Sequence, residues 1–188
     1  MKKNSDEVRS RIREAACKLL RTYGVKGWTM DMLCEEANLA KDTLYRIIVS
    51  KEVLIAEAMA EKLMNHKKKM EAMMAADEDY FSNVNSLCEA FRDLLNEFGT
   101  PQLRSIFKEY PKIETSVNDY MNQLNRDIAD YLNRGKALGL ISSDADTLLI
   151  AKSLNYVILD FLNDNAIEQV DDAVTKFLQY LIYGIKKR

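Results

Sequence analysis

The side chains best suited to chemistry in this chain are hydroxyls and cations that gather between residues 29 and 51. Such groups donate hydrogen bonds to phosphate oxygens, and on a helix inserted into the major groove they also reach the edges of bases. Free backbone N–H groups at a helix start add affinity for anions. The segment therefore predicts contact with double-stranded DNA, made by Thr29, Ala40, Lys41, Asp42, Thr43, Tyr45, Arg46 and Lys51.

Two short helices joined by a tight turn are needed to present these side chains. Thr29 is suited to cap a first helix that ends at Ala37, and Asn38 tolerates the left-handed backbone of a turn. A second helix then begins at Lys41 and runs to about Ile47. Small residues where the helices cross and apolar residues that lock them complete a helix-turn-helix pattern, formed by Leu33, Cys34, Ala37, Leu39, Leu44, Ile47 and Ile48.

The distribution of charge supports contact with phosphate at one end of the chain. The whole chain of 188 residues has a formal net charge of −2. Residues 1 to 70 hold 15 Lys and Arg against 10 Asp and Glu, a net charge of +5, so the remainder carries −7. A basic first third is typical of a protein that meets nucleic acid there.

The sequence argues against an enzyme, and no cofactor or metal is expected. A di-iron helical bundle needs two Glu-x-x-His motifs, but the chain has one histidine, His66, preceded three residues earlier by Leu63. It lacks a glycine-rich phosphate loop, a nucleophile elbow and Cys/His metal spacing. Because His66 lies among the lysines of residues 62–69, we expect it to be exposed.

Cysteine usage and hydropathy indicate a cytoplasmic protein without a membrane helix. Cys17, Cys34 and Cys88 form no CxxC pair, and an odd count does not suggest a disulfide framework, so they are expected to be small core residues. No stretch approaches the roughly 18 consecutive apolar residues of a membrane helix. The first residues lack the apolar run of a secretory signal.

The rest of the chain predicts an all-α fold of about nine helices. Ser5 is suited to cap the first helix, and Ser50 a long fourth helix that reaches the Met73–Met74 region. Further helices are expected at about 78–98, 101–110, 111–139, from Ser143 or Asp144 to 162, and 166–185. We expect a helix-turn-helix domain at 1–51 and a second helical domain at 52–188.

The N-terminal segment resembles the tetracycline-repressor (TetR) family of bacterial regulators. The family pattern is a basic helix, a Thr-Thr pair, a short helix with a turn, a Lys-Gly-Thr-Leu-Tyr recognition helix and Ser-Lys-Glu. The match covers roughly residues 8 to 55 and includes Ala15-Ala16, Gly24, Thr29, Ala37, Lys41, Thr43-Leu44-Tyr45-Arg46 and Ser50-Lys51-Glu52. The chain departs from the pattern at Trp28, where a second Thr is common, and at Asn38, Ala40, Asp42 and Ile47-Ile48.

The resemblance implies a homodimeric regulator, usually a repressor, that binds a palindromic operator. One helix-turn-helix reads only a few base pairs, so such proteins bind two half-sites about 34–36 Å apart. In the family the last two helices pair across a two-fold axis, and both are rich in apolar residues here. The alternative is that both helices are internal core. The expected interface residues are Leu154, Ile158, Phe161, Val170, Val174, Phe177 and Leu181.

The resemblance also implies a small-molecule effector bound among the middle helices. Its binding would move the recognition helices out of register, which requires that it prefer the DNA-incompetent state. The expected lining residues are Met59, Leu63, Phe91, Leu95, Tyr120, Met121, Leu124, Tyr156 and Asp160, although Met and aromatic stripes at helical spacing more often belong to a core. An all-helical protein-interaction module that never binds DNA is the alternative function.

Overall fold

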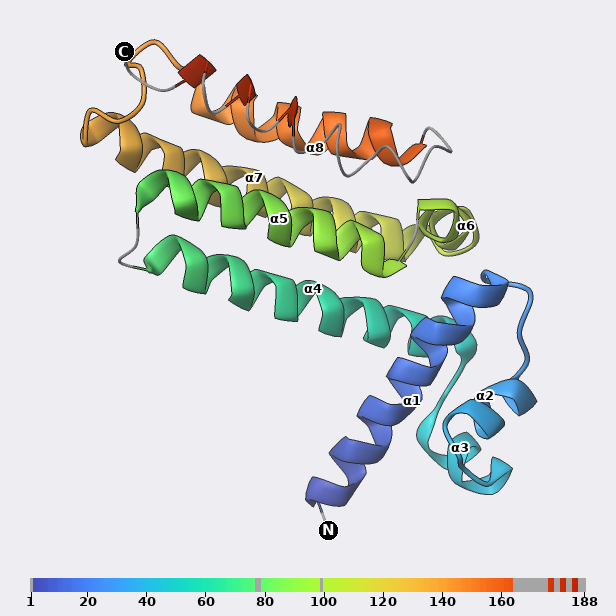
Figure 1. Ribbon diagram of the computed structural model, residues 1–188. Helices are drawn as coiled ribbons and strands as arrows, with labels where there is room; N and C mark the ends of the chain where they lie inside the picture. The colour runs from blue at the N-terminus through green and yellow to red at the C-terminus, as the bar shows by residue number, and fades with distance from the viewer. Residues whose placement is uncertain are drawn as a thin grey trace. The chain divides into compact units, whose positions relative to one another are not determined.

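The computed structural model describes residues 2–76, 79–98, 100–163, 176–177, 180–181 and 184–185. In these ranges the chain forms eight helices and no β-strand (Figure 1). They are α1 (Lys2–Tyr23), α2 (Met30–Glu36), α3 (Lys41–Ile47), α4 (Lys51–Ala75), α5 (Tyr80–Phe98), α6 (Thr100–Glu109), α7 (Pro111–Ala137) and α8 (Thr147–Asn163). The all-α fold predicted from the sequence is confirmed, and the helix count is close to the expected nine.

The chain divides into two compact units. The first contains Met1–Asn65 and Leu94–Ser116, and the second contains His66–Asp93 and Val117–Arg188. Helices α4, α5 and α7 each contribute residues to both units. The domain boundary predicted from the sequence lies after residue 51, at the start of α4. The first compact unit extends beyond it and also contains most of α4 and all of α6.

The first unit is held together by apolar faces of α1, α2, α3, α4 and α6. Its fully buried side chains include Ile12 of α1, Leu33 of α2, Leu44 of α3, Leu54 of α4 and Ile106 of α6. Polar contacts flank this core. Arg13 of α1 forms a two-pronged ion pair with Glu61 of α4, with N–O distances of 2.5 and 3.0 Å.

The loop after α1 is fixed to α6 within the same unit. Lys26 Nζ lies 2.8 Å from a carboxylate oxygen of Glu109, and the Gln102 side-chain amide donates to the backbone carbonyl of Arg21 at 3.0 Å. These contacts tie the segment that leads into α2 to a helix far away in sequence. The pKa of Lys26 is raised because Glu109 accepts a hydrogen bond from it.

The second unit packs α4, α5, α7 and α8 through a mixed apolar and aromatic core. Tyr80 of α5 stacks on Tyr131 of α7 with ring centroids 5.0 Å apart, and its hydroxyl donates to the Tyr131 carbonyl at 3.3 Å. Gly135 allows this contact, because a Cβ atom there would overlap the Tyr80 ring. The pKa of the Tyr80 hydroxyl is raised by burial.

His66 is buried, so the expectation of an exposed histidine was wrong. Only 6% of the residue is exposed, and its Nδ1 shares a hydrogen bond with the Tyr120 hydroxyl of α7. Lys67 and Lys68, which directly follow His66, point away from its face and are exposed, whereas Met70, four residues after it, shares that face and is buried. A run of charged neighbours therefore did not predict the environment of this position.

Most helix ends follow the sequence signals, with two exceptions. The first helix begins at Lys2 and not after Ser5, because no helix breaker precedes Ser5 and the helix extends toward the N-terminus. Helix α8 begins at Thr147, and the cap is Asp146, whose carboxylate accepts the Leu149 N–H at 2.9 Å. Ser143 and Asp144, the expected caps, lie in a turn before it.

The predicted last helix, 166–185, lies mostly outside the described residues. Within the described ranges no helix is long and apolar enough to cross a membrane. The same ranges hold no group of three or more His, Cys, Asp and Glu placed to bind a metal ion.

Candidate nucleic-acid interface

The turn between α2 and α3 has the geometry that the sequence predicts. The Thr29 hydroxyl accepts the Met32 N–H at 3.3 Å and caps α2. Asn38 has a φ of 49°, in the left-handed region, and the Leu39 N–H donates to the Cys34 carbonyl at 2.9 Å to close the turn. Figure 1 shows α2 and α3 as two short helices joined at this turn.

Helix α3 starts without a side-chain cap. Its N-cap residue is Ala40, whose carbonyl accepts the N–H groups of Thr43 and Leu44 at 3.0 and 3.1 Å. Because alanine has no hydroxyl, the first N–H groups of α3 receive no side-chain acceptor from Ala40. An anion such as a DNA phosphate is a suitable acceptor for N–H groups at a helix start.

Apolar residues lock α3 in place and leave its other face outward. Leu33, Ala37 and Leu44 are fully buried, and Cys34 is 7% exposed at the helix crossing. On the outer face Lys41, Asp42, Tyr45 and Arg46 are exposed, with 58% of Tyr45 accessible, and Thr43 is half-buried. The hydroxyl and cationic groups of α3 therefore lie at the surface of the first unit.

Two of the three predicted cations already have partners. Lys41 Nζ lies 2.7 Å from a carboxylate oxygen of Asp31, and this hydrogen bond raises the pKa of Lys41. Lys51 Nζ donates to the Trp28 backbone carbonyl at 2.8 Å and lies 3.8 Å from the centre of the Trp28 ring. Arg46 makes no ion pair within the described part of the chain.

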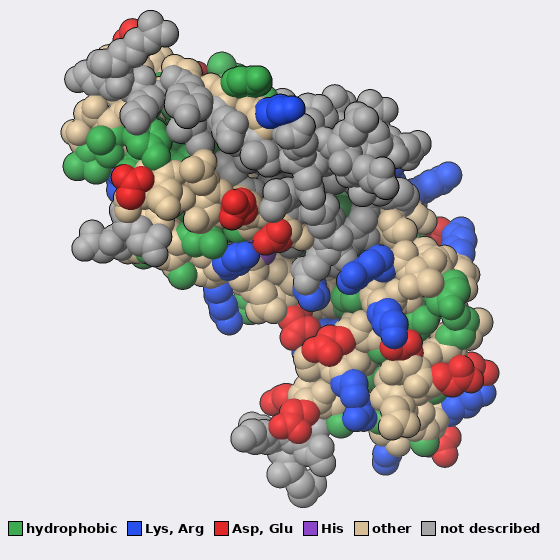
Figure 2. Space-filling model, in the orientation of Figure 1, with side chains coloured by type: hydrophobic (Ala, Val, Ile, Leu, Met, Phe, Trp, Pro, Cys, Tyr) green, Lys and Arg blue, Asp and Glu red, His purple; other side chains and the backbone are tan. Residues whose placement is uncertain are grey.

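Carboxylates limit the positive charge near α3. Asp42 is exposed on α3 itself, Asp31 holds Lys41, and Glu36 of α2 pairs with Lys18 of α1 at 2.7 Å. In Figure 2 basic and acidic side chains are interspersed over the first unit. The surface is thus suited to directional hydrogen bonds more than to a broad electrostatic attraction.

The comparisons with known proteins agree with this geometry. Residues 12–58 match the model of the bacterial regulatory proteins of the tetR family. An uncharacterized HTH-type transcriptional regulator, YhgD of Bacillus subtilis (strain 168), is 32% identical over 123 residues, which are 64% of this chain and 63% of the relative. These similarities support a TetR-family regulator, and the chain spans a little less than two thirds of the length of the Bacillus subtilis relative.

Solved structures extend the similarity over the whole chain. A TetR-family regulator from Cytophaga hutchinsonii has a TM-score of 0.78 at 20% identity and covers 98% of each chain. A TetR regulator from Chloroflexus aurantiacus J-10-FL has a TM-score of 0.78 at 17% identity and covers 100% of each chain. At this identity the likeness shows the fold alone. The relatives are named as transcriptional regulators, which agrees with the expectation that the chain is not an enzyme.

The structure describes the side chains of six of the nine predicted effector residues. Met59 and Leu63 belong to the first unit, and Met59 is buried. In the second unit Tyr120 and Met121 are half-buried and Leu124 is buried. Tyr156 is 72% exposed, and the side chains of Phe91, Leu95 and Asp160 lie outside the described ones.

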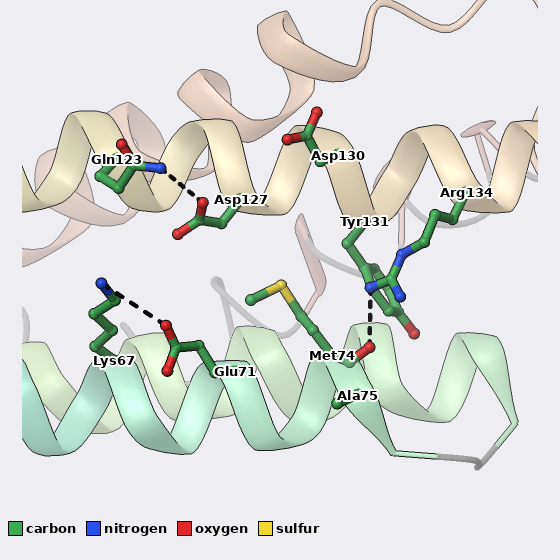
Figure 3. A pocket seen from close by; sticks show the side chains of 9 residues that line it. All are labelled: Lys67, Glu71, Met74, Ala75, Gln123, Asp127, Asp130, Tyr131 and Arg134. Carbon is green, nitrogen blue, oxygen red and sulfur yellow. Dashed lines mark hydrogen bonds and ion pairs between the residues drawn. The ribbon is translucent and has the colours of Figure 1, made fainter.

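A pocket of about 500 Å³ opens in the second unit between α4 and α7 (Figure 3). Its polar groups are partly paired with one another: Lys67 with Glu71, Gln123 with Asp127, and Arg134 with the Met74 carbonyl. The lining consists of Lys67, Glu71, Met74, Ala75, Gln123, Asp127, Asp130, Tyr131 and Arg134. None of these is among the predicted lining residues, because charged residues at helical spacing resemble an ordinary solvent-facing surface, whereas the predicted ones come from apolar and aromatic stripes.

The predicted interface residues fall mostly outside the described ones. Leu154, Phe177 and Leu181 are half-buried, whereas Val170 and Val174 and the side chains of Ile158 and Phe161 lie outside the described part. Among the side chains of α8 that the structure describes, the large apolar ones that are exposed are Leu148, Leu149 and Tyr156. Leu149 and Tyr156 are seven residues apart, two helical turns, and so share a face.

Proposed function

We propose that this TetR-family chain is a DNA-binding transcriptional regulator that represses transcription by binding a palindromic operator as a homodimer. A small-molecule effector releases it from the operator. The match of residues 12–58 to the family model supports the DNA-binding role, and the relatives are named as regulators. The dimer, the sign of regulation and the effector are carried over from the family resemblance.

The observation that carries the DNA-binding role is the outer face of α3. A buried helix crossing fixes α3, and Tyr45, Arg46 and Asp42 project from it into solvent. Backbone N–H groups at its start add anion donors at the same end. A helix presented in this way has the side chains needed for both phosphate contact and base readout.

Selection of bound fragments from a random pool of duplex DNA tests the proposal most directly. We expect an enriched palindrome whose half-site centres are separated by about one helical turn or a multiple of it. Two symmetric half-sites would support both groove readout and dimerism. Enrichment of a single half-site would remove the dimer from the proposal, and no enrichment would contradict sequence-specific binding.

The dependence of affinity on salt separates this function from that of a helical interaction module. A protein that neutralises several phosphates loses affinity with a log–log slope of about −0.9 per contact. We expect a steep negative slope for the selected operator. A flat response would favour the module that binds no DNA.

The pocket of the second unit supports the effector part of the proposal. Its mixture of carboxylates, cations and an aromatic ring favours a small polar molecule over an apolar one. A small-molecule fraction from cells should release the operator from the wild-type protein. Ala75→Trp places a large ring in the pocket lining and should prevent that release without weakening operator binding; equal release from both proteins would place the effector elsewhere.

A further inference from the structure

The contact between Trp28 and Lys51 joins the residue before α2 to the first residue of α4. Trp28 directly precedes Thr29, the N-cap of α2, and is 2% exposed. Lys51 comes from 23 positions further along the chain, and its Nζ meets both the ring of Trp28, at 3.8 Å from the centroid, and its carbonyl, at 2.8 Å. One ammonium group therefore touches the side chain and the backbone of the same residue.

This contact restricts a side chain that is otherwise highly mobile. Ordering a free lysine side chain on binding costs rotamer entropy. Tryptophan offers the most favourable aromatic face for a cation, and the effect grows when the pair is removed from water. Lys51 is half-buried, and this burial lowers its pKa. A single rotamer is thus favoured before any ligand binds.

The held ammonium retains donors for a further partner. A lysine ammonium has three N–H donors, and the Trp28 carbonyl takes one. Lys51 also lies at the N-terminus of α4. The hydroxyl of Thr29 accepts the Met32 N–H, and its own proton can still be donated to a further acceptor. Lys51, which contacts the ring, and Thr29, the next residue after Trp28, thus each offer a side-chain donor.

We propose that Trp28 is a positioning residue that holds the Lys51 ammonium ready to bind a phosphate of the DNA backbone. The inference rests on the proposed DNA-binding function and adds to it a residue that itself touches no DNA. It also gives a role to Trp28, where the resembled pattern commonly has a threonine. The ring acts through Lys51, so its removal should weaken phosphate contact without altering base readout.

A double-mutant cycle tests the coupling between the two side chains. The proteins are wild type, Trp28→Leu, Lys51→Met and the double variant, each titrated with a duplex of random sequence so that only backbone contact is measured. We expect Trp28→Leu to weaken binding about five-fold when Lys51 is present and to have almost no effect when Lys51 is replaced. The log–log salt slope of Trp28→Leu should fall by up to about 0.9.

Different outcomes separate failure of the inference from failure of the function. An equal loss in both backgrounds would mean that Trp28 only supports the fold, and no loss in either would mean that Lys51 needs no positioning; both overturn the inference while DNA binding stands. If the wild-type protein did not bind DNA, or bound it with an affinity that did not fall as salt rose, the proposed function itself would be overturned.

Fluorescence provides a second readout that does not require the replacement of Trp28. The chain has one tryptophan, so its emission reports this contact alone. DNA binding should change the emission of the wild-type protein, because phosphate alters the charge next to the ring. The change should be largely absent in Lys51→Met at saturating DNA. The same change in both proteins would contradict the proposal even if Trp28→Leu failed to fold.

Discussion

At the residue scale, the exposure of Tyr45 separates recognition from stability. Its neighbour Leu44 is fully buried and fixes α3, whereas 58% of Tyr45 is open to solvent. A substitution at Tyr45 therefore removes a hydroxyl and a ring from the surface and leaves the helix crossing intact. Tyr45 therefore allows contact with DNA to be tested separately from the stability of the fold.

Tyr45→Ala is expected to weaken operator binding about ten-fold, because a hydrogen bond to phosphate or base is lost together with apolar contact. Helicity and the thermal midpoint should stay close to wild type. Fluorescence anisotropy with the selected operator measures the affinity, and circular dichroism the fold. Tyr23→Ala is the matched control, since Tyr23 is a tyrosine 51% exposed at the end of α1. Equal losses in the two variants would remove Tyr45 from the interface.

At the element scale, an ion pair joins α1 to α4 within the first unit. The Arg13 guanidinium hydrogen-bonds both carboxylate oxygens of Glu61, which lowers the pKa of that carboxyl below its ordinary value and raises the pKa of Arg13. Burial opposes both shifts but is outweighed. The pair therefore stabilises the folded unit most when Glu61 is ionised.

Glu61→Gln is expected to reduce the free energy of unfolding by about 1 kcal/mol at neutral pH, a modest value because Glu61 is partly exposed. Since the folded pKa is depressed, the contribution is complete above the unfolded pKa of about 4.3 and is lost as the pH falls through the folded pKa. Urea denaturation from pH 7 to below about pH 4 should show the difference from wild type shrinking. Glu14→Gln, an exposed carboxylate of α1, is the control. A difference that stays constant with pH would contradict the assignment.

Gly135 presents a competition between helix propensity and packing. Alanine is better than glycine in a helix interior by about 1 kcal/mol, but a Cβ atom at 135 would overlap the ring and hydroxyl of Tyr80. Because Tyr80 is stacked on Tyr131, it has little room to move away. Crowding of this kind costs about 1–3 kcal/mol, so the clash should outweigh the gain.

Gly135→Ala is therefore expected to lower the free energy of unfolding by about 1 kcal/mol. In a Tyr80→Leu background, where the ring is absent, the same change should be neutral or stabilising. Urea denaturation of the wild type, the two single variants and the double variant measures both effects. If Gly135→Ala stabilised the protein that contains Tyr80, the contact in the second unit would be looser than described.

Local signals in the sequence predicted the elements around the turn better than those elsewhere. Thr29, Asn38 and Ser50 act as expected because caps and turns depend on neighbouring backbone groups. The start of α8 was misplaced, since several residues before it are all suited to be caps and the choice depends on tertiary packing. His66 was misplaced for a related reason, because its burial depends on which face of α4 meets α7.

The same limit applies to the candidate sites. The predicted DNA-contacting residues lie within one short segment, so the exposure of four of them on α3 could be predicted from the helical period: Lys41, Asp42, Tyr45 and Arg46. The pairing of Lys41 with Asp31 and of Lys51 with Trp28 depends on how separate elements meet in space, which the helical pattern of each element does not predict. The pocket of the second unit joins charged residues of α4 and α7, which sequence patterns read separately as solvent-facing.

At the scale of the whole molecule, the exposed apolar face of α8 favours association with a second chain. Leu149 is 61% and Tyr156 72% exposed, and the two share a face of the helix. Contiguous exposed apolar residues often mark protein interfaces. The proposed dimer would bury both residues. The sequence pattern placed Tyr156 among the predicted effector residues, and Leu149 in neither predicted set.

Replacing both residues by arginine, Leu149→Arg with Tyr156→Arg, is expected to convert the dimer to a monomer, because unpaired guanidinium groups would have to lose water at the interface. Each monomer would then bind one half-site on its own. The affinity for the palindrome should therefore fall about a hundred-fold, whereas the affinity for a single half-site should change little. Analytical ultracentrifugation gives the mass, and anisotropy the affinity. Leu138→Arg is the control, since this leucine is 70% exposed but follows α7. If the double variant kept the mass of a dimer, the interface would lie elsewhere. If the wild-type protein were a monomer and still bound the palindrome with full affinity, two separate monomers would occupy the half-sites without forming a dimer.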